Sequence, residues 1–232
     1  MRNTGALIIT ADDYGYREAY DRGIVEAAGA HAVDAVSAMV TRGRIDPEAV
    51  LATGVEIGLH LELPPELIDT PRAGARQRKA AIAVLRDQLE RFESLFERQP
   101  AYLDGHHHCH ARPGLGAAMA REARGLRLPM RSVGPDHRRL LRRERVATPD
   151  LLVGRLTEEA EAALPEELRP AIEEGGELPA GVTEWMVHPG HSDPDAGSGY
   201  DRAREEDLDL LLGLGLDPAL TAARLTHVAA LG

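Results

Sequence analysis

The sequence contains one cysteine, Cys109, in 232 residues, which excludes an internal disulfide framework and favours a reducing compartment. No apolar run approaches the roughly 18 residues of a membrane span. The apolar run at residues 6–9 is also shorter than the roughly 7–15 residues of a signal-peptide core. The chain lacks internal repeats and any Gly-x-Ser-x-Gly motif that would offer a serine nucleophile. These absences predict a soluble, cytoplasmic protein without a membrane partner.

Acidic residues outnumber basic ones by 38 to 27, so the formal charge is −11. This charge argues against a nucleic-acid partner, because nucleic acids bind basic patches. The hydrophobic share of 43% supplies a real core, and the length suits a single domain spanning residues 1–232. Residues 138–145 are basic, and residues 157–179 are acidic and rich in proline and glycine. We therefore expect a surface insertion around residues 136–180.

Short apolar runs alternate with amphipathic helical patterns along the chain. The clearest helix has apolar side chains at steps of three and four, and the expected helices cover residues 16–30, 79–98 and 201–212. Asp46 and Asp217 each precede a proline, a pattern typical of a helix N-cap. The expected strands are residues 6–10, 35–40, 55–61, 101–104, 183–188 and 225–230. The alternation predicts a mostly parallel sheet, in either a doubly wound fold or a closed barrel.

Carboxylate or imidazole side chains end four of the apolar runs. They are Asp12 with Asp13, His60, Asp104 with His106, and His188. One aspartate of the first pair can serve as the N-cap of the next helix, and a lone histidine in a strand is often a satisfied core residue. However, active sites of parallel α/β folds gather at the carboxyl ends of the strands. A mixed Asp/His/His set at that edge is typical of a catalytic divalent-metal site.

Four histidines crowd into residues 106–110, around Cys109. In an extended segment alternate residues share a face. Asp104, His106, His108 and His110 would then point in one direction. We interpret this face as part of a metal or catalytic site, with a solvated histidine-rich loop as the alternative. A structural zinc site would need more than a single cysteine.

Four segments carry a family resemblance, and they occur in order along nearly the whole chain. They are T-A-D-D-Y-G at residues 10–15, G-L-H-L at 58–61, Y-L-D-G-H-H-H-C-H at 102–110 with Pro113, and T-E-W-M-V-H-P-G at 183–190 with Tyr200, Arg204 and Glu205. Together they resemble the YdjC/ChbG-type carbohydrate deacetylase family. The resemblance implies a distorted (β/α) barrel and metal-dependent removal of an acetyl group from an N-acetylated sugar.

The resemblance also implies roles for individual residues. Asp13, His60 and His106 would bind a divalent metal, either Mg²⁺ or Zn²⁺. Asp12 would be the general base and His188 the general acid that protonates the leaving amine. The neighbouring residues expected to bind substrate or support the ligands are Asp104, His108, His110 and, by a looser match, Arg131.

Two other function classes stay open on the sequence. One is a metal-dependent barrel isomerase or lyase that acts on a small sugar-like molecule. The other is a non-catalytic protein that binds a metal or a sugar. The adjacent Asp12 and Asp13 favour the hydrolase, because simple binding needs no base beside the metal. The sequence leaves the oligomeric state open, with a homodimer among the options.

Overall fold

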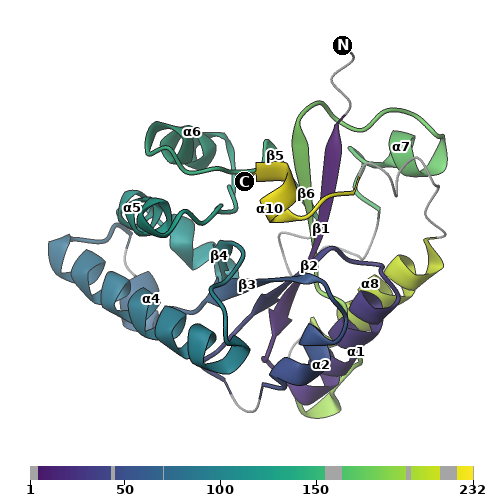
Figure 1. Ribbon diagram of the computed structural model, residues 1–232, viewed down its shortest axis with the longest axis horizontal. Coiled ribbons are helices and arrows are strands. Elements are labelled where there is room, and N and C mark those ends of the chain that lie inside the picture. Colours follow the sequence, from purple (N-terminus) through teal and green to yellow (C-terminus); the bar gives the residue numbers. More distant parts are fainter. Residues whose placement is uncertain are drawn as a thin grey trace.

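A six-stranded, fully parallel sheet with the strand order β4-β3-β2-β1-β6-β5 forms the centre of the computed structural model. The structure describes residues 5–42, 45–69, 71–154, 164–196, 200–214 and 224–231. The strands are β1 (Ala6–Tyr14), β2 (Ala35–Ala38), β3 (Glu56–Leu61), β4 (Leu103–Gly105), β5 (Leu151–Gly154) and β6 (Val182–Val187). Figure 1 shows the sheet curling between the helices.

The helices are named in chain order. They are α1 (Glu18–Gly29), α2 (Pro47–Leu51), α3 (Pro65–Ile68), α4 (Ala75–Phe96), α5 (Gly116–Leu126), α6 (Pro135–Arg143), α7 (Arg169–Glu173), α8 (Asp201–Gly213) and α10 (His227–Leu231). Two 3₁₀ segments, η1 (His106–Ala111) and η2 (Pro194–Ala196), lie between them. Within the described residues, no helix is both long and apolar enough to cross a membrane.

Residues 129–131 continue the sheet beyond β4, and this extension makes the sheet resemble a barrel. The Leu103 amide donates to the Pro129 carbonyl at 2.9 Å, and the Arg131 amide donates to the Leu103 carbonyl at 3.1 Å. On its other side this segment reaches the chain just before β5, where the Met130 amide donates to the Ala147 carbonyl at 2.9 Å. The expected (β/α) barrel-like single domain is therefore confirmed.

The core consists of apolar side chains from both faces of the sheet. Strand β1 is buried along almost its whole length, as expected of a parallel strand covered on both faces. Helix α4 turns Leu85, Phe92 and Phe96 toward this core, and each fully buried side chain of this kind contributes roughly 1.5–3 kcal/mol. The helices predicted at residues 16–30, 79–98 and 201–212 are α1, α4 and α8.

Some of the sequence-based expectations need correction. Strand β5 lies within the surface insertion expected at residues 136–180, yet it pairs with β6 as an edge strand of the sheet, and α6 packs against α5. The N-cap expected at Asp46 is confirmed, because its side chain accepts a hydrogen bond from the Ala49 amide at 3.1 Å. The one expected at Asp217 lies outside the described residues.

The strand expected at residues 225–230 is wrong, because α10 occupies this part of the chain. Its first residue, His227, is fully buried, and its ring stacks on Tyr102 with centroids 3.7 Å apart. Its backbone amide donates to Glu56 at 2.6 Å, and its ring nitrogen Nε2 lies 3.4 Å from Glu184. Burial would lower the pKa of His227, but hydrogen bonds with Glu184 and Glu56 raise it above the ordinary value.

The raised pKa of His227 predicts how the stability depends on pH. A group with a raised folded-state pKa stabilises the protein fully below its unfolded pKa of about 6.5 and loses that contribution as pH rises through the folded pKa. We therefore expect the stability advantage of the wild type over His227→Gln to be largest below about pH 6.5 and to shrink in alkali. Thermal unfolding across this pH range measures it.

The surface variant His191→Gln is the matched control for this measurement. His191 is partly exposed and lies 3.1 Å from Glu26, and exposed pairs of this kind stabilise proteins little. We expect its unfolding midpoint to follow that of the wild type at every pH. A gap between wild type and His227→Gln that is the same at pH 6 and pH 9 would contradict the assignment.

Candidate active site

The carboxyl end of β1 supplies two adjacent aspartates to one site. Adjacent residues of a regular strand point to opposite faces, but the pairing of β1 with β2 shifts register between Ala11 and Tyr14. Asp13 adopts a left-handed backbone with φ of 73°, a conformation that is costly for a residue other than glycine and clusters at functional sites. This bulge lets both Asp12 and Asp13 approach His60. Neither caps α1, whose N-cap is Arg17.

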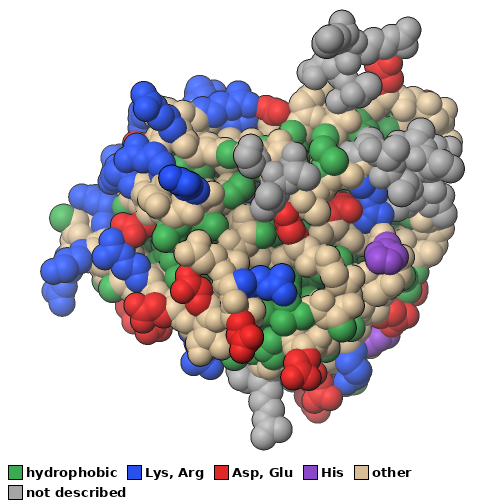
Figure 2. All heavy atoms as spheres, viewed as in Figure 1, with side chains coloured by type: hydrophobic (Ala, Val, Ile, Leu, Met, Phe, Trp, Pro, Cys, Tyr) green, Lys and Arg blue, Asp and Glu red, His purple; other side chains and the backbone are tan. Residues whose placement is uncertain are grey.

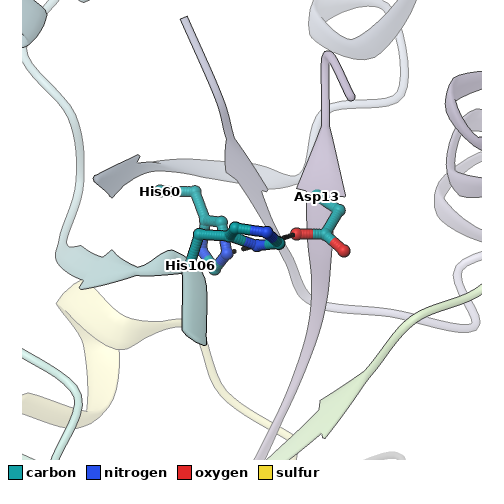
Figure 3. Close-up of side chains that lie close together, drawn as sticks. All are labelled: Asp13, His60 and His106. Atoms are coloured by element: carbon teal, nitrogen blue, oxygen red, sulfur yellow. Dashed lines mark hydrogen bonds and ion pairs between the residues drawn. The ribbon is translucent and has the colours of Figure 1, made fainter. Parts of the chain in front are cut away.

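Asp13, His60 and His106 converge from three neighbouring segments (Figure 3). Asp13 Oδ1 lies 3.3 Å from His60 Nε2 and 3.0 Å from His106 Nδ1. One ligand atom from each residue lies within 4.8 Å of the others. Two imidazole nitrogens and a carboxylate oxygen suit a divalent metal and leave positions free for water and substrate. This group could hold a metal ion.

The charges around this group favour the ionised form of its carboxylate. Burial would raise the pKa of Asp13, but Arg204 and the hydrogen bonds with His106 and His60 hold it well below its usual range. The Arg204 Nη2 group donates to Asp13 Oδ2 at 2.5 Å. Burial would lower the pKa of His60, but the carboxylates of Asp104 and Asp12 raise it well above the ordinary value.

Asp104 joins this group to a second, fully buried set of charges. Its Oδ1 lies 2.8 Å from His60 Nδ1, which directs the other ring nitrogen of His60 toward Asp13. Its Oδ2 accepts from Ser37 at 2.7 Å and pairs with Arg131 at 2.9 Å. Asp12, His60 and Asp104 thereby form a second group whose ligand atoms lie within 4.8 Å of one another.

Arg131 holds Asp12 in a bidentate ion pair. Its Nη1 and Nη2 groups donate to the two Asp12 oxygens at 2.6 and 2.8 Å, and its Nε donates to Glu184 at 2.9 Å. All of these groups are almost completely buried. Burial would lower the pKa of Arg131, but Asp104, Asp12 and Glu184 raise it well above its usual range. Such a fork fixes the orientation of the Asp12 carboxylate.

The histidine-rich segment does not extend the strand, so the expected shared face of Asp104, His106, His108 and His110 is wrong. After Gly105 the chain turns into η1, where His107 and His108 have left-handed φ values of 48° and 54°. A Cβ at Gly105 would lie 2.9 Å from Cys109 Sγ and 3.1 Å from His110 Nδ1, so glycine leaves the space that these two side chains occupy.

Of these histidines, only His106 belongs to a group of described residues that could hold a metal ion. His110 is buried, and its Nε2 donates to the Arg131 carbonyl at 3.1 Å. His107 is exposed. Burial lowers the pKa of His108 to about 4, with a further lowering by Arg131, so its ring is neutral at pH 7.

A comparison with models of known protein families matches residues 6–222 of this chain to the family described as YdjC-like protein. The chain belongs to the YdjC-like family. It is 29% identical to a chitooligosaccharide deacetylase of Serratia marcescens over 94% of this chain and 93% of the relative. It is also 29% identical to a carbohydrate deacetylase of Geobacillus stearothermophilus, over 93% and 91%. A candidate cellobiose-phosphate cleavage protein of Enterococcus faecalis V583 has a similar solved structure, with a TM-score of 0.69, 25% identity and coverage of 95% and 94%.

In this YdjC-like chain, His188 follows β6 at the same edge of the sheet. Its Nδ1 lies 3.4 Å from the Tyr200 hydroxyl. Burial lowers the pKa of His188 to about 4, although Asp13 and Asp12 act in the opposite direction. The ring is therefore neutral at pH 7.

Sequence reasoning gave no role to two charged residues of this YdjC-like site. Arg204 of α8 forms an ion pair with Asp13, and its guanidinium lies 4.1 Å from the centre of the Tyr20 ring. Glu184 pairs with Arg131 from the middle of β6. The available signal for Glu184 was a carboxylate within an otherwise apolar strand. The signal for Arg204 was its place among the residues that carry the family resemblance, but its position on a helix indicated no role, because a charged residue there is usually exposed.

Proposed function

We propose that this protein is a metal-dependent carbohydrate deacetylase that hydrolyses the acetamide of an N-acetylated sugar. The observation that carries the proposal is the convergence of Asp13, His60 and His106 directly beside Asp12, at the carboxyl edge of a barrel-like sheet. A metal-ligand group next to a separate carboxylate suits hydrolysis, which needs both a polarised carbonyl and a proton acceptor. The deacetylase names of relatives that cover most of this chain support the same reaction.

In the proposed mechanism, Asp13, His60 and His106 hold a divalent metal ion. When bound, this ion would polarise the acetyl carbonyl and make water more acidic. Asp104 accepts a hydrogen bond from the N–H group at His60 Nδ1, so that Nε2, once deprotonated, is the nitrogen that would bind the ion. Arg204 balances the charge of Asp13 from the opposite side of the carboxylate.

Asp12 is proposed to take the proton that the attacking water loses. Arg131 orients both Asp12 oxygens, so the base is fixed before substrate arrives. His188 is proposed to protonate the leaving amine. Because its resting ring is neutral, His188 must first take up the proton that Asp12 removed from the attacking water, and it then passes a proton to the amine nitrogen. One hydrogen of water thereby reaches the amine, and the other stays on the new carboxyl group, which yields acetate when it ionises.

The direct test is acetate release from a panel of N-acetylated sugars, with chelated enzyme and with Mg²⁺ or Zn²⁺ added back. We expect chelation to abolish release and one of the two ions to restore it, with the imidazole ligands favouring Zn²⁺. Metal binding without acetate release from any acetylated sugar would instead indicate a binding protein. Full activity after chelation would exclude the metal.

Two neighbouring histidines provide a matched pair of variants for this test. His106→Asn removes a proposed ligand, so we expect lower metal content. Activity should fall at least tenfold, since mutating even the residues that support a metal ligand typically lowers activity by roughly 10–100-fold. His107 is exposed and lies outside the group. Asparagine tolerates its left-handed backbone, so His107→Asn should retain both metal and activity. Equal losses in the two variants would contradict the ligand assignment.

A further inference from the structure

A cavity lies between the N-terminal parts of α4, α5 and α6, apart from the proposed metal ligands. It has a volume of about 790 Å³, a size that suits a small molecule. None of Asp12, Asp13, His60, His106 or His188 lines it. The described lining residues include five arginines, namely Arg72, Arg78, Arg112, Arg121 and Arg143.

This part of the surface is basic although the whole chain is acidic. Residues 111–145 contain ten arginines and three carboxylates, in a protein of net charge −11. Figure 2 shows Lys and Arg side chains gathered over α6, α5 and the end of α4 beside them. The basic stretch at residues 138–145, which the proposed reaction does not use, belongs to this region. Such a reversal of charge around a cavity attracts anions.

Most of the cavity's guanidinium groups have no carboxylate partner among the described residues. The structure records none for Arg72, Arg112 or Arg143, while Arg78 donates to the Ala73 carbonyl at 3.0 Å and Arg121 lies 3.7 Å from Glu144. The single carboxylate among the described lining residues, Asp136, is itself paired with Arg139. The charge of the cavity is therefore strongly positive.

The backbone adds to this positive potential. Helices α4, α5 and α6 each begin after the chain leaves the carboxyl edge of the sheet, and their first turns line the cavity. Helix N-termini carry partial positive charge and free amide groups. They are favourable places for phosphate, sulfate or carboxylate groups.

A buried imidazole also offers a hydrogen bond at the cavity. His137 is only 8% exposed and lines the cavity. Its Nδ1 accepts from the Val133 amide at 3.4 Å, so the proton of the neutral ring is on Nε2. Within the described part of the chain, that Nε2 has no hydrogen-bond partner. An unsatisfied buried donor is costly, and an oxyanion would satisfy it.

We propose that this arginine-lined cavity binds a multivalent oxyanion, with Arg112 and Arg143 as principal contacts and His137 Nε2 as a neutral donor. The anion is either a separate small molecule or an anionic group on an acetylated sugar. His137 lies beside the buried His110, since the centroids of their rings are 5.5 Å apart. His110 in turn donates a hydrogen bond to the Arg131 carbonyl. Oxyanion binding does not depend on the proposed deacetylase reaction.

Calorimetric titration of metal-depleted protein with inorganic pyrophosphate tests the proposal. Metal depletion is needed because pyrophosphate also binds divalent ions. The informative variant is Arg112→Gln/Arg143→Gln, and the matched control is Arg91→Gln/Arg98→Gln, which has the same net charge. Arg91 lies thirteen residues beyond Arg78 in α4, about 20 Å along the helix, and lines no part of the cavity.

We expect the double cavity variant to weaken pyrophosphate binding by roughly tenfold or more, because it removes two charge-assisted contacts. The control should bind like the wild type, and added salt should weaken binding in both. Equal affinity in the wild type and both variants, or no binding to any of them, would overturn the proposal. The titration measures binding and requires no acetate release. Its result therefore does not depend on whether the protein is a deacetylase.

A kinetic arm identifies the source of the anion. Acetate release from a neutral acetylated sugar and from one carrying a carboxylate or phosphate is compared between the wild type and the cavity variant. A KM increase confined to the anionic sugar assigns the cavity to substrate. Unchanged KM values for both sugars, together with weakened pyrophosphate binding, assign it to a separate anion.

Discussion

Asp12→Asn is expected to slow acetate release by about 10²–10⁴-fold, the usual effect of removing a general base, while the protein still binds its metal. Asparagine has nearly the size of aspartate but cannot accept the proton of the attacking water. Arg131 keeps two further carboxylate partners, Asp104 and Glu184, so the buried network loses only one of its three anions. Excess metal should not restore the rate.

Asp13→Asn is expected to act through the metal instead. Asp13 Oδ1 lies between His60 Nε2 and His106 Nδ1, where it would supply the charged ligand of the ion. A neutral amide oxygen binds a divalent ion more weakly than a carboxylate. We therefore expect low metal content and low activity that excess metal partly restores. Metal analysis and acetate release, measured for both variants side by side, separate the two roles.

Asp46→Asn is the control for this pair. Asp46 caps α2 through the Ala49 amide, and asparagine caps helices about as well as aspartate. This variant should keep wild-type metal content, activity and stability. If Asp12→Asn lost the metal while Asp13→Asn kept it, the two roles would be reversed. If both variants stayed fully active, the proposed mechanism would be wrong.

The sequence predicted that the side chains of the candidate site lie at one edge of the sheet, because each of them ends or follows a short apolar run. Asp13 and His60 lie near the carboxyl ends of β1 and β3, and His106 follows β4, and parallel strands bring those ends together. Helix α4 was predictable for a similar reason, since its apolar side chains recur with the helical period. Both patterns are local, so a single sequence reveals them.

The errors arise where the structure depends on distant contacts or unusual backbone. The turn of η1 rests on left-handed conformations at His107 and His108, which side-chain alternation cannot indicate. The short apolar run at residues 225–230 fits a strand as well as a helix, and contacts of His227 with Glu56 and Glu184 accompany the helix. The ion pair of Arg131 with Asp12 joins residues 119 positions apart.

Arg131→Gln is expected to destabilise the protein by about 3–5 kcal/mol at neutral pH, the usual effect of removing one partner from a buried ion pair. Arg131 is the common partner of Asp12, Asp104 and Glu184, and all four side chains are almost completely buried. Without its guanidinium, three carboxylates would remain in a region of low dielectric. For a chain of this length, thermal unfolding should begin roughly 6–20 °C lower.

The pH dependence distinguishes this electrostatic cause from a packing defect. Burial would raise the pKa of Asp104, but Arg131 and, after it, His60 hold this pKa below its ordinary value. Burial would also raise the pKa of Glu184, but Arg131 and, after it, His227 hold that pKa below its ordinary value. In the wild type, this contribution is present above the unfolded pKa of about 4 and is lost as pH falls through the lowered folded values. In Arg131→Gln, burial without the guanidinium raises the pKa of both groups, so their ionisation destabilises the variant above that pH.

The difference in unfolding free energy between the wild type and Arg131→Gln should therefore be largest at pH 7 and shrink toward pH 4. Denaturant unfolding at several pH values measures it, with the exposed Arg91→Gln as the control that should stay within about 0.5 kcal/mol of the wild type. A gap of the same size at every pH would assign the loss to packing around the side chain. In that case the charge of Arg131 would not be what stabilises the buried carboxylates beside the proposed metal ligands.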